Sequence, residues 1–266
     1  MKRFSIFLLF VFALSCTCLS CHENQAEAAA PPKRVITVEA DTLVQGNDSL
    51  PYLLYTVRFE DEQEPLPLII FFHGAGERGN DNQRQLIHCK DAFLADSITQ
   101  RHSYRLFIPQ CPVGYRWVET DWKLPEHTMP KEPSIPMRMA NYLIDSLIGS
   151  GTIDTNRIYT AGLSMGGFGV WDLLQRRPNL CAAAIPMCGG GDPAYAPQLT
   201  QVALRIYHGA LDKAVMPQRS QQMYDAIVKA GGKKAKLTMY PDIAHPCWDR
   251  PFEKEAAIDW MFLQTK

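Results

Sequence analysis

The sequence predicts an α/β fold in which a mostly parallel sheet of the eight-stranded type is covered by helices on both faces. Short β-rich runs alternate with helix-period segments in the later part of the chain, as is typical of parallel βαβ units. Several runs are apolar throughout, such as Leu-Ile-Ile-Phe-Phe at 68–72, which suits strands buried on both faces. With 266 residues, of which 46% are hydrophobic, the chain can bury this core as one domain.

The predicted elements follow one another in a regular order. Strands are expected at 35–38, 53–59, 68–72, 105–108, 158–161, 182–186, 204–207 and 236–240. Helices are expected at 137–148, 168–175, 218–229 and 253–263. Ligands of such sheets bind beyond the carboxyl ends of the strands, so the residues that follow each strand are the candidates for a functional site.

The first residues have the pattern of an export signal. Met-Lys-Arg precedes an apolar run at 4–14 that is too short to span a bilayer. We expect a signal peptide at 1–21, a linker at 22–34 and a catalytic domain at 35–266. The segments around Cys16 and Cys21 each resemble part of a bacterial lipoprotein site, whereas Ala-Glu-Ala at 26–28 resembles an ordinary cleavage site, so the point of cleavage stays open, with lipidation favoured. The predicted location is periplasmic, secreted or outer-membrane lipoprotein, with membrane contact only through such an anchor.

Charge and cysteine content narrow the classes of partner. The formal charge is −1 and there is no long Lys/Arg run, so no nucleic-acid partner is predicted. The sequence contains no P-loop, dinucleotide-binding or H-E-x-x-H motif, so no cofactor or metal is predicted either. The spacing of the later cysteines leaves one or two disulfides and simple burial both open. These cysteines are Cys89, Cys111, Cys181, Cys188 and Cys247.

The pentapeptide Gly-Leu-Ser-Met-Gly at 162–166 is the strongest functional signal. It lies between the strand predicted at 158–161 and the helix predicted at 168–175, which is the context of a nucleophile elbow. Glycines on both sides let strand and helix approach closely, and the strained turn exposes the serine hydroxyl. We therefore predict that Ser164 is a nucleophile.

Two other strand ends supply the partners that a serine nucleophile needs. Asp212 follows the strand at 204–207, and His245 follows the strand at 236–240. An imidazole takes the proton of the hydroxyl, and a carboxylate holds the imidazole in the productive tautomer. The chain order Ser164, Asp212, His245 is the one found in α/β-hydrolases. The alternatives that stay open are His208 as base and Asp192, Asp242 or Asp249 as acid.

An oxyanion hole can be predicted from the same motifs. The N–H of Met165 follows the nucleophile directly and is one expected donor. The second donor is expected from the glycine-rich loop at 73–79, where small residues let the backbone approach the substrate. Gly74 and Ala75 are both candidates.

Taken together, the motifs resemble those of secreted α/β-hydrolase esterases, which are grouped with polyhydroxybutyrate-depolymerase-like, feruloyl-esterase-like and predicted peptidase/phospholipase sequences. The resemblance spans roughly 53–263 and rests on the segments 73–79, 162–167, 208–212 and 245–249. It implies an α/β-hydrolase fold, with Ser164, His245 and Asp212 as nucleophile, base and acid. One departure is Ala244, where a glycine often precedes the histidine.

The substrate is predicted less directly. Only 18 residues separate Pro186 from Arg205, so no large lid domain is expected. Trp117, Trp122 and Trp248 are predicted substrate contacts, because aromatic rings stack on sugars or phenolic acyl groups; packing of an irregular loop is the alternative.

The sequence thus predicts a serine carboxylic-ester hydrolase that forms an acyl-enzyme on extracellular small-molecule or oligosaccharide esters, such as acetyl or feruloyl esters of polysaccharide. A serine peptidase of this fold and a glycan-binding surface protein on a catalytically dead scaffold are the alternatives. No oligomeric state is predicted.

Overall fold

The computed structural model describes residues 33–253 and 256–266. The predicted signal peptide at 1–21 and nearly all of the predicted linker lie outside these residues, as do Cys16 and Cys21. No helix in the described ranges has the length and apolar character needed to cross a membrane.

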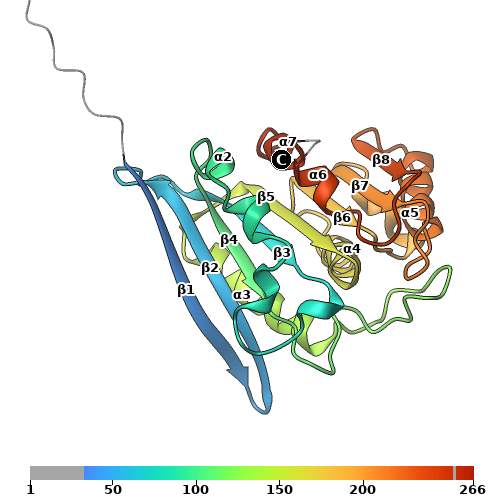
Figure 1. Cartoon of the computed structure of the whole chain (residues 1–266), viewed down its shortest axis with the longest axis horizontal. Helices are drawn as coiled ribbons and strands as arrows, with labels where there is room; N and C mark the ends of the chain where they lie inside the picture. Colours follow the sequence, from blue (N-terminus) through green and yellow to red (C-terminus); the bar gives the residue numbers. More distant parts are fainter. Residues whose placement is uncertain (1–32, 254–255) are drawn as a thin grey trace, which may run out of the picture. The chain divides into compact units, whose positions relative to one another are not determined.

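One eight-stranded sheet organises the described part of the chain, in the order β1-β2-β4-β3-β5-β6-β7-β8 (Figure 1). The pairs β1·β2 and β2·β4 are antiparallel and the others are parallel, which confirms the predicted mostly parallel sheet. Each predicted β-rich run lies in one of these strands, except that residue 182 precedes β6. Their bounds are β1 Arg34–Gln45, β2 Asp48–Phe59, β3 Leu66–Phe72, β4 Tyr104–Pro109, β5 Ile153–Leu163, β6 Ala183–Met187, β7 Ala203–Gly209 and β8 Ala235–Tyr240.

Helices cover both faces of the sheet, as predicted (Figure 1). Alternate residues of β3 divide between two apolar clusters: Leu68 and Ile70 pack with α3 and α4, whereas Ile69 and Phe71 pack with α1 and α7. The α-helices are α1 Lys90–Phe93, α2 Asp96–Thr99, α3 Ile135–Gly149, α4 Met165–Arg176, α5 Gln218–Lys229, α6 Asp249–Glu253 and α7 Ala257–Phe262. Three 3₁₀ turns are η1 Ala75–Glu77, η2 Arg84–Leu86 and η3 Pro193–Leu199.

Two elements differ from their predicted form. Of the helix predicted at 253–263, only α7 forms over Ala257–Phe262, while Glu253 is the last residue of α6; Ala256, directly before α7, has a left-handed backbone with φ of 46° and ψ of 41°, which a right-handed helix does not contain. The first strand continues to Gln45 and forms a long antiparallel hairpin with β2, whose turn contains Gly46 at φ of 63°. The apolar run at 35–38 marks only the start of this strand.

Two connections at the carboxyl edge of the sheet bear on the site. Between β6 and β7 the chain forms only η3, which agrees with the predicted absence of a large lid. Between β4 and α3 the chain runs without regular secondary structure from 110 to 134. All five cysteines in the described ranges are buried and free, so burial describes them better than disulfides.

Candidate active site

Ser164 occupies the turn between β5 and α4. Its backbone has φ of 54° and ψ of −120°, a strained conformation for a residue with a side chain. A Cβ atom on Gly162 would lie 2.5 Å from the carbonyl oxygen of Gly166, and one on Gly166 would lie 2.7 Å from the carbonyl oxygen of His73. Both glycines are therefore required by the close approach of strand and helix at the elbow.

The structure brings Ser164, His245 and Asp212 into one line of hydrogen bonds. Nε2 of His245 lies 2.8 Å from Oγ of Ser164, and Nδ1 lies 2.6 Å from Oδ2 of Asp212. Nδ1–H donates to the carboxylate, which leaves Nε2 as an acceptor for the serine proton. We call these residues the triad below; the arrangement can transfer the hydroxyl proton to His245 as Ser164 attacks an electrophilic carbon.

The carboxylate of Asp212 is held in its charged form. Burial alone would raise the pKa of this group, but hydrogen bonds from His208, His245 and the N–H of Val215 outweigh it and hold the pKa well below its usual range. Oδ1 also accepts from the N–H of Ala214 at 2.8 Å. The carboxylate is thus a fixed anion beside the imidazole.

His208 takes a supporting place beside the acid. Its buried ring contacts Oδ2 of Asp212 and the carbonyl oxygen of Val215 through Nε2, at 3.1 Å and 3.0 Å, and Oγ of Ser220 through Nδ1 at 2.7 Å. Both Nε2 partners accept hydrogen bonds, so Nε2 carries the proton. His208 therefore contacts the acid rather than Ser164.

The other three candidates for the acid of the triad contact other groups. Asp192 caps η3 and accepts hydrogen bonds from the N–H groups of Ala194 and Met129. Asp242 pairs with Arg250 at 2.8 Å on the surface. Asp249 begins α6 and lines the cavity described below.

The three candidate oxyanion-hole amides, those of Met165, Gly74 and Ala75, lie at this edge of the sheet. Met165 is the first residue of α4, and Gly74 and Ala75 follow His73, the first residue after β3. Phe72 at the end of β3 pairs with Gly162 of β5, so the loop and the elbow are neighbours. None of the three amides donates a hydrogen bond to a backbone or side-chain group in the described ranges.

The three tryptophans occupy different environments. Trp117 is fully buried, donates from Nε1 to the carbonyl oxygen of His73 at 3.0 Å, and packs edge-on against Phe72. The prediction that Trp117 contacts substrate is therefore wrong, because its ring is buried in the core against Phe72 and the backbone of His73. Trp122 is half-buried under Arg116, with 4.7 Å from the guanidinium to the ring. Trp248 is half-buried 5.6 Å from the ring of His245, at the flank of the triad.

Cys188 is a contact of the site that the sequence did not indicate. It follows β6 with φ of 49°, and its Sγ donates to the carbonyl oxygen of His245 at 3.0 Å. The N–H of Cys247 donates to the same carbonyl at 2.8 Å. Possible metal ligands from Cys188, Asp212 and His245 lie within 4.8 Å of one another. Both nitrogens of His245 are engaged within the triad, so this group is better described as the support of a catalytic histidine.

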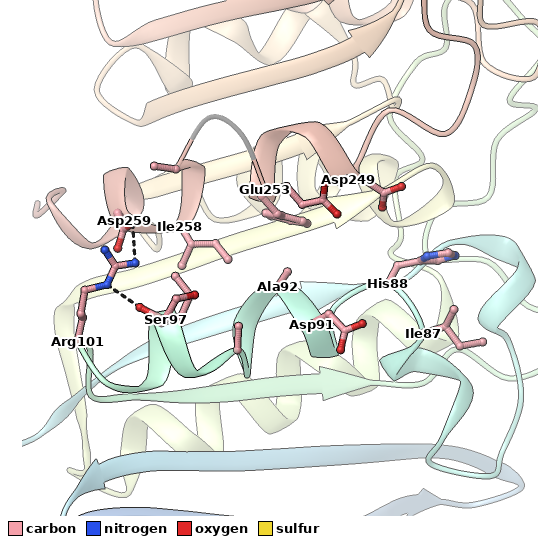
Figure 2. Close-up of a pocket in the computed structure, with 14 residues that line it drawn as sticks. Ile87, His88, Asp91, Ala92, Ser97, Arg101, Asp249, Glu253, Ile258 and Asp259 are labelled. Carbon is pink, nitrogen blue, oxygen red and sulfur yellow. Dashed lines mark hydrogen bonds and ion pairs between the residues drawn. The ribbon is translucent and has the colours of Figure 1, made fainter.

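A cavity of about 510 Å³ lies away from the triad, between α1–α2 and α6–α7 (Figure 2). Arg101 at one end pairs with a carboxylate of α7 at 3.0 Å. At the other end, the ring of His88 lies 5.3 Å from that of Trp248. No residue of the triad lines the cavity, so its polar groups are not part of the proton path. Its carboxylates are Asp91, Asp249, Glu253 and Asp259.

Comparisons with known proteins agree with this fold. Residues 57–257 match the model of a phospholipase/carboxylesterase family. A thermostable esterase of known structure is 31% identical with a TM-score of 0.76 over 86% of this chain, which spans 63% of that esterase. No curated protein gives a match.

More distant structures share the fold. A ferulic acid esterase is 17% identical, with a TM-score of 0.60 over 86% of this chain and 97% of the other. An acylaminoacyl peptidase from Pyrococcus horikoshii is 15% identical, with a TM-score of 0.59 over 85% of this chain and 40% of the other. At these identities the likeness concerns the fold and does not separate ester from amide hydrolysis.

Proposed function

The chain belongs to the phospholipase/carboxylesterase family, and we propose that it is a serine esterase that acts through an acyl-enzyme. The observation that carries the proposal is the alignment of the triad, with 2.8 Å between Oγ and Nε2 and 2.6 Å between Nδ1 and Oδ2. Such an alignment is expected when the serine hydroxyl must lose its proton during attack.

The proposed reaction has two half-reactions. Oγ of Ser164 attacks the ester carbonyl while Nε2 of His245 takes its proton, and the charge on the carbonyl oxygen is stabilised by amide donors at the elbow and the loop after β3. The imidazolium returns the proton to the alcohol oxygen as the C–O bond breaks, which leaves the acyl group on Ser164. A water molecule, deprotonated by His245, then releases the acid and restores the serine.

The proposed substrates are extracellular esters with short or aromatic acyl groups, such as acetyl or feruloyl groups on polysaccharide. The short connection between β6 and β7 supports this proposal, since it leaves no long lid to cover an extended acyl groove. Trp248 supports it as well, because its half-buried ring flanks His245 and offers a flat apolar face. Export rests on the signal predicted at 1–21, with the protein anchored by lipid or free.

The test combines an active-site probe with a panel of substrates. A fluorophosphonate should label the wild-type protein and the control variant Ser97→Ala, which changes an exposed serine of α2, but not Ser164→Ala. Labelling that persists in Ser164→Ala would assign the nucleophile elsewhere. An unlabelled wild-type protein would favour a glycan-binding scaffold instead.

The panel consists of p-nitrophenyl acetate, methyl ferulate, acetylated xylan fragments, emulsified triolein and an aminoacyl p-nitroanilide, at matched concentrations of the scissile bond. We expect the soluble esters to be hydrolysed fastest, without a rate jump at the oil–water interface. Dominant hydrolysis of triolein would make the protein a lipase, and dominant hydrolysis of the anilide would make it a peptidase.

A further inference from the structure

His73, the first residue after β3, has both ring nitrogens in hydrogen bonds. The side chain is buried, with 1% of its surface exposed. Nδ1 lies 2.6 Å from the carbonyl oxygen of Gly74, and Nε2 lies 2.9 Å from the backbone nitrogen of Cys111. A buried histidine with both nitrogens bonded has a fixed orientation.

These partners determine the tautomer of His73. The N–H of Cys111 can only donate, so Nε2 must be the unprotonated acceptor. The single ring proton is therefore on Nδ1, where it donates to the carbonyl oxygen of Gly74. Burial lowers the pKa of His73 to about 4, so the ring is neutral at ordinary pH.

This hydrogen bond orients the peptide that joins Gly74 to Ala75. In a trans peptide the C=O and N–H groups point in opposite directions. The C=O points to the ring of His73, which is bonded to Cys111 just beyond β4. Because β3 lies between β4 and β5 in the sheet, the N–H of Ala75 projects to the other side, where Ser164 follows β5.

The neighbouring peptides are held as well. The carbonyl oxygen of His73 accepts from Nε1 of Trp117 at 3.0 Å and faces the first turn of α4, so the N–H of Gly74 points away from that turn. On the other side, Nε of Arg78 donates to the carbonyl oxygen of Ala75 at 2.8 Å. Of the two candidate donors, only the N–H of Ala75 is directed to the elbow.

We propose that His73 is a positioning residue, whose Nδ1–H bond turns the Gly74–Ala75 peptide so that the N–H of Ala75, with that of Met165, forms the oxyanion hole. The inference rests on the proposed esterase function and specifies how its transition state is stabilised. Gly74 fits closely at the pivot: a Cβ atom there would lie 2.8 Å from both Oε2 of Glu77 and Cδ1 of Leu163, so these side chains would have to move.

Two polar substitutions separate the two ring nitrogens. The amide nitrogen of His73→Asn can replace Nδ1 as the donor to Gly74, whereas the oxygen of His73→Gln can replace Nε2 as the acceptor from Cys111. For His73→Gln we expect a fall in kcat of about 10- to 100-fold on p-nitrophenyl acetate, below the 10²- to 10³-fold cost of deleting an oxyanion donor, with KM nearly unchanged. His73→Asn should retain more of kcat than His73→Gln.

The control is His102→Asn, which changes a histidine that pairs with Asp259 and stacks on Phe262. It should match the wild-type kcat, and thermal unfolding of all three variants shows whether they are folded. Equal losses in His73→Asn and His73→Gln, or a loss confined to KM, would overturn the positioning role.

A second measurement does not depend on activity. The ¹⁵N spectrum of the His73 ring should show a protonated Nδ1 and an unprotonated Nε2 at neutral pH, and the opposite tautomer would overturn the inference even if the esterase is active. If the wild-type protein hydrolyses no ester and takes no fluorophosphonate label, the proposed function fails and the catalytic role of His73 fails with it. The ring spectrum then still decides the proposed peptide orientation.

Discussion

Gly166→Ala should damage the elbow without touching any group of the triad. A Cβ atom at this position would overlap the carbonyl oxygen of Phe72, and it would lie 2.5 Å from the carbonyl carbon of Phe72 and 2.7 Å from the carbonyl oxygen of His73. Both neighbours are backbone atoms of the β3 end, which cannot rotate away as a side chain would. Ordinary contact begins at 3.4 Å, so α4 must retreat from β3 by at least about 1 Å.

That displacement is large compared with the tolerance of the reaction. Ser164 is the residue before the first turn of α4, so it moves with the helix away from Nε2 of His245. A misplacement of about 1 Å in such a site costs on the order of 10² in rate. Overpacking should also cost about 1 to 3 kcal/mol in the free energy of unfolding.

The assay compares Gly166→Ala with Gly149→Ala. Gly149 is the exposed last residue of α3, and no atom lies within 4 Å of a Cβ atom placed there. The control should keep wild-type kcat and gain up to about 1 kcal/mol from the higher helix propensity of alanine. Thermal unfolding and kcat on p-nitrophenyl acetate are measured for both, and a Gly166→Ala protein with wild-type stability and rate would refute the contact argument.

Three further outcomes are expected, each with its own measurement. Asp212→Asn should lose up to about 10⁴ in kcat, because the amide cannot hold the productive imidazole tautomer; near-normal steady-state rates would shift the acid role to another carboxylate. His245→Ala should lose several orders of magnitude in turnover, and His208→Ala much less, since His208 contacts the acid and not the nucleophile; the reverse ranking would exchange their roles. The free energy of unfolding, measured by urea titration, should fall between pH 6.5 and about pH 4, because the unfolded chain binds protons on His73 and His127 before the folded protein does. For buried His73 the loss is of the order of 3 kcal/mol, and it should be absent from His73→Asn; an equal slope in the two proteins would contradict it.

The parts of the site that could be predicted are those that depend on local sequence and on strand order. Glycines around Ser164 are required by the elbow itself, and the carboxyl ends of parallel strands meet at one edge whatever the intervening helices do. For that reason Asp212 and His245, which follow β7 and β8, could be placed near Ser164 before any contact was known.

The parts that could not be predicted depend on contacts between distant segments. An aromatic residue in an irregular loop has the same sequence signal whether it faces solvent or the core. Trp117 is buried because its Nε1 donates to the carbonyl oxygen of His73 and its ring packs against the ring of Phe72. Cys188 gave no signal either, since its contact with the carbonyl of His245 exists only when β6 and the chain after β8 are brought together.

The same contacts explain why two histidines that follow adjacent strands have different roles. His208 and His245 both donate to Oδ2 of Asp212, at 3.1 Å and 2.6 Å. The second nitrogen of His208 is engaged by buried Ser220, so no proton can pass from it to substrate, whereas the second nitrogen of His245 faces Ser164. Because the pKa of Asp212 lies well below its usual range, the acid stays charged when the solution becomes acidic. Protonation of Asp212 is therefore not expected to cause a loss of activity on mild acidification, and the pair of donors on Oδ2 keeps the carboxylate in place.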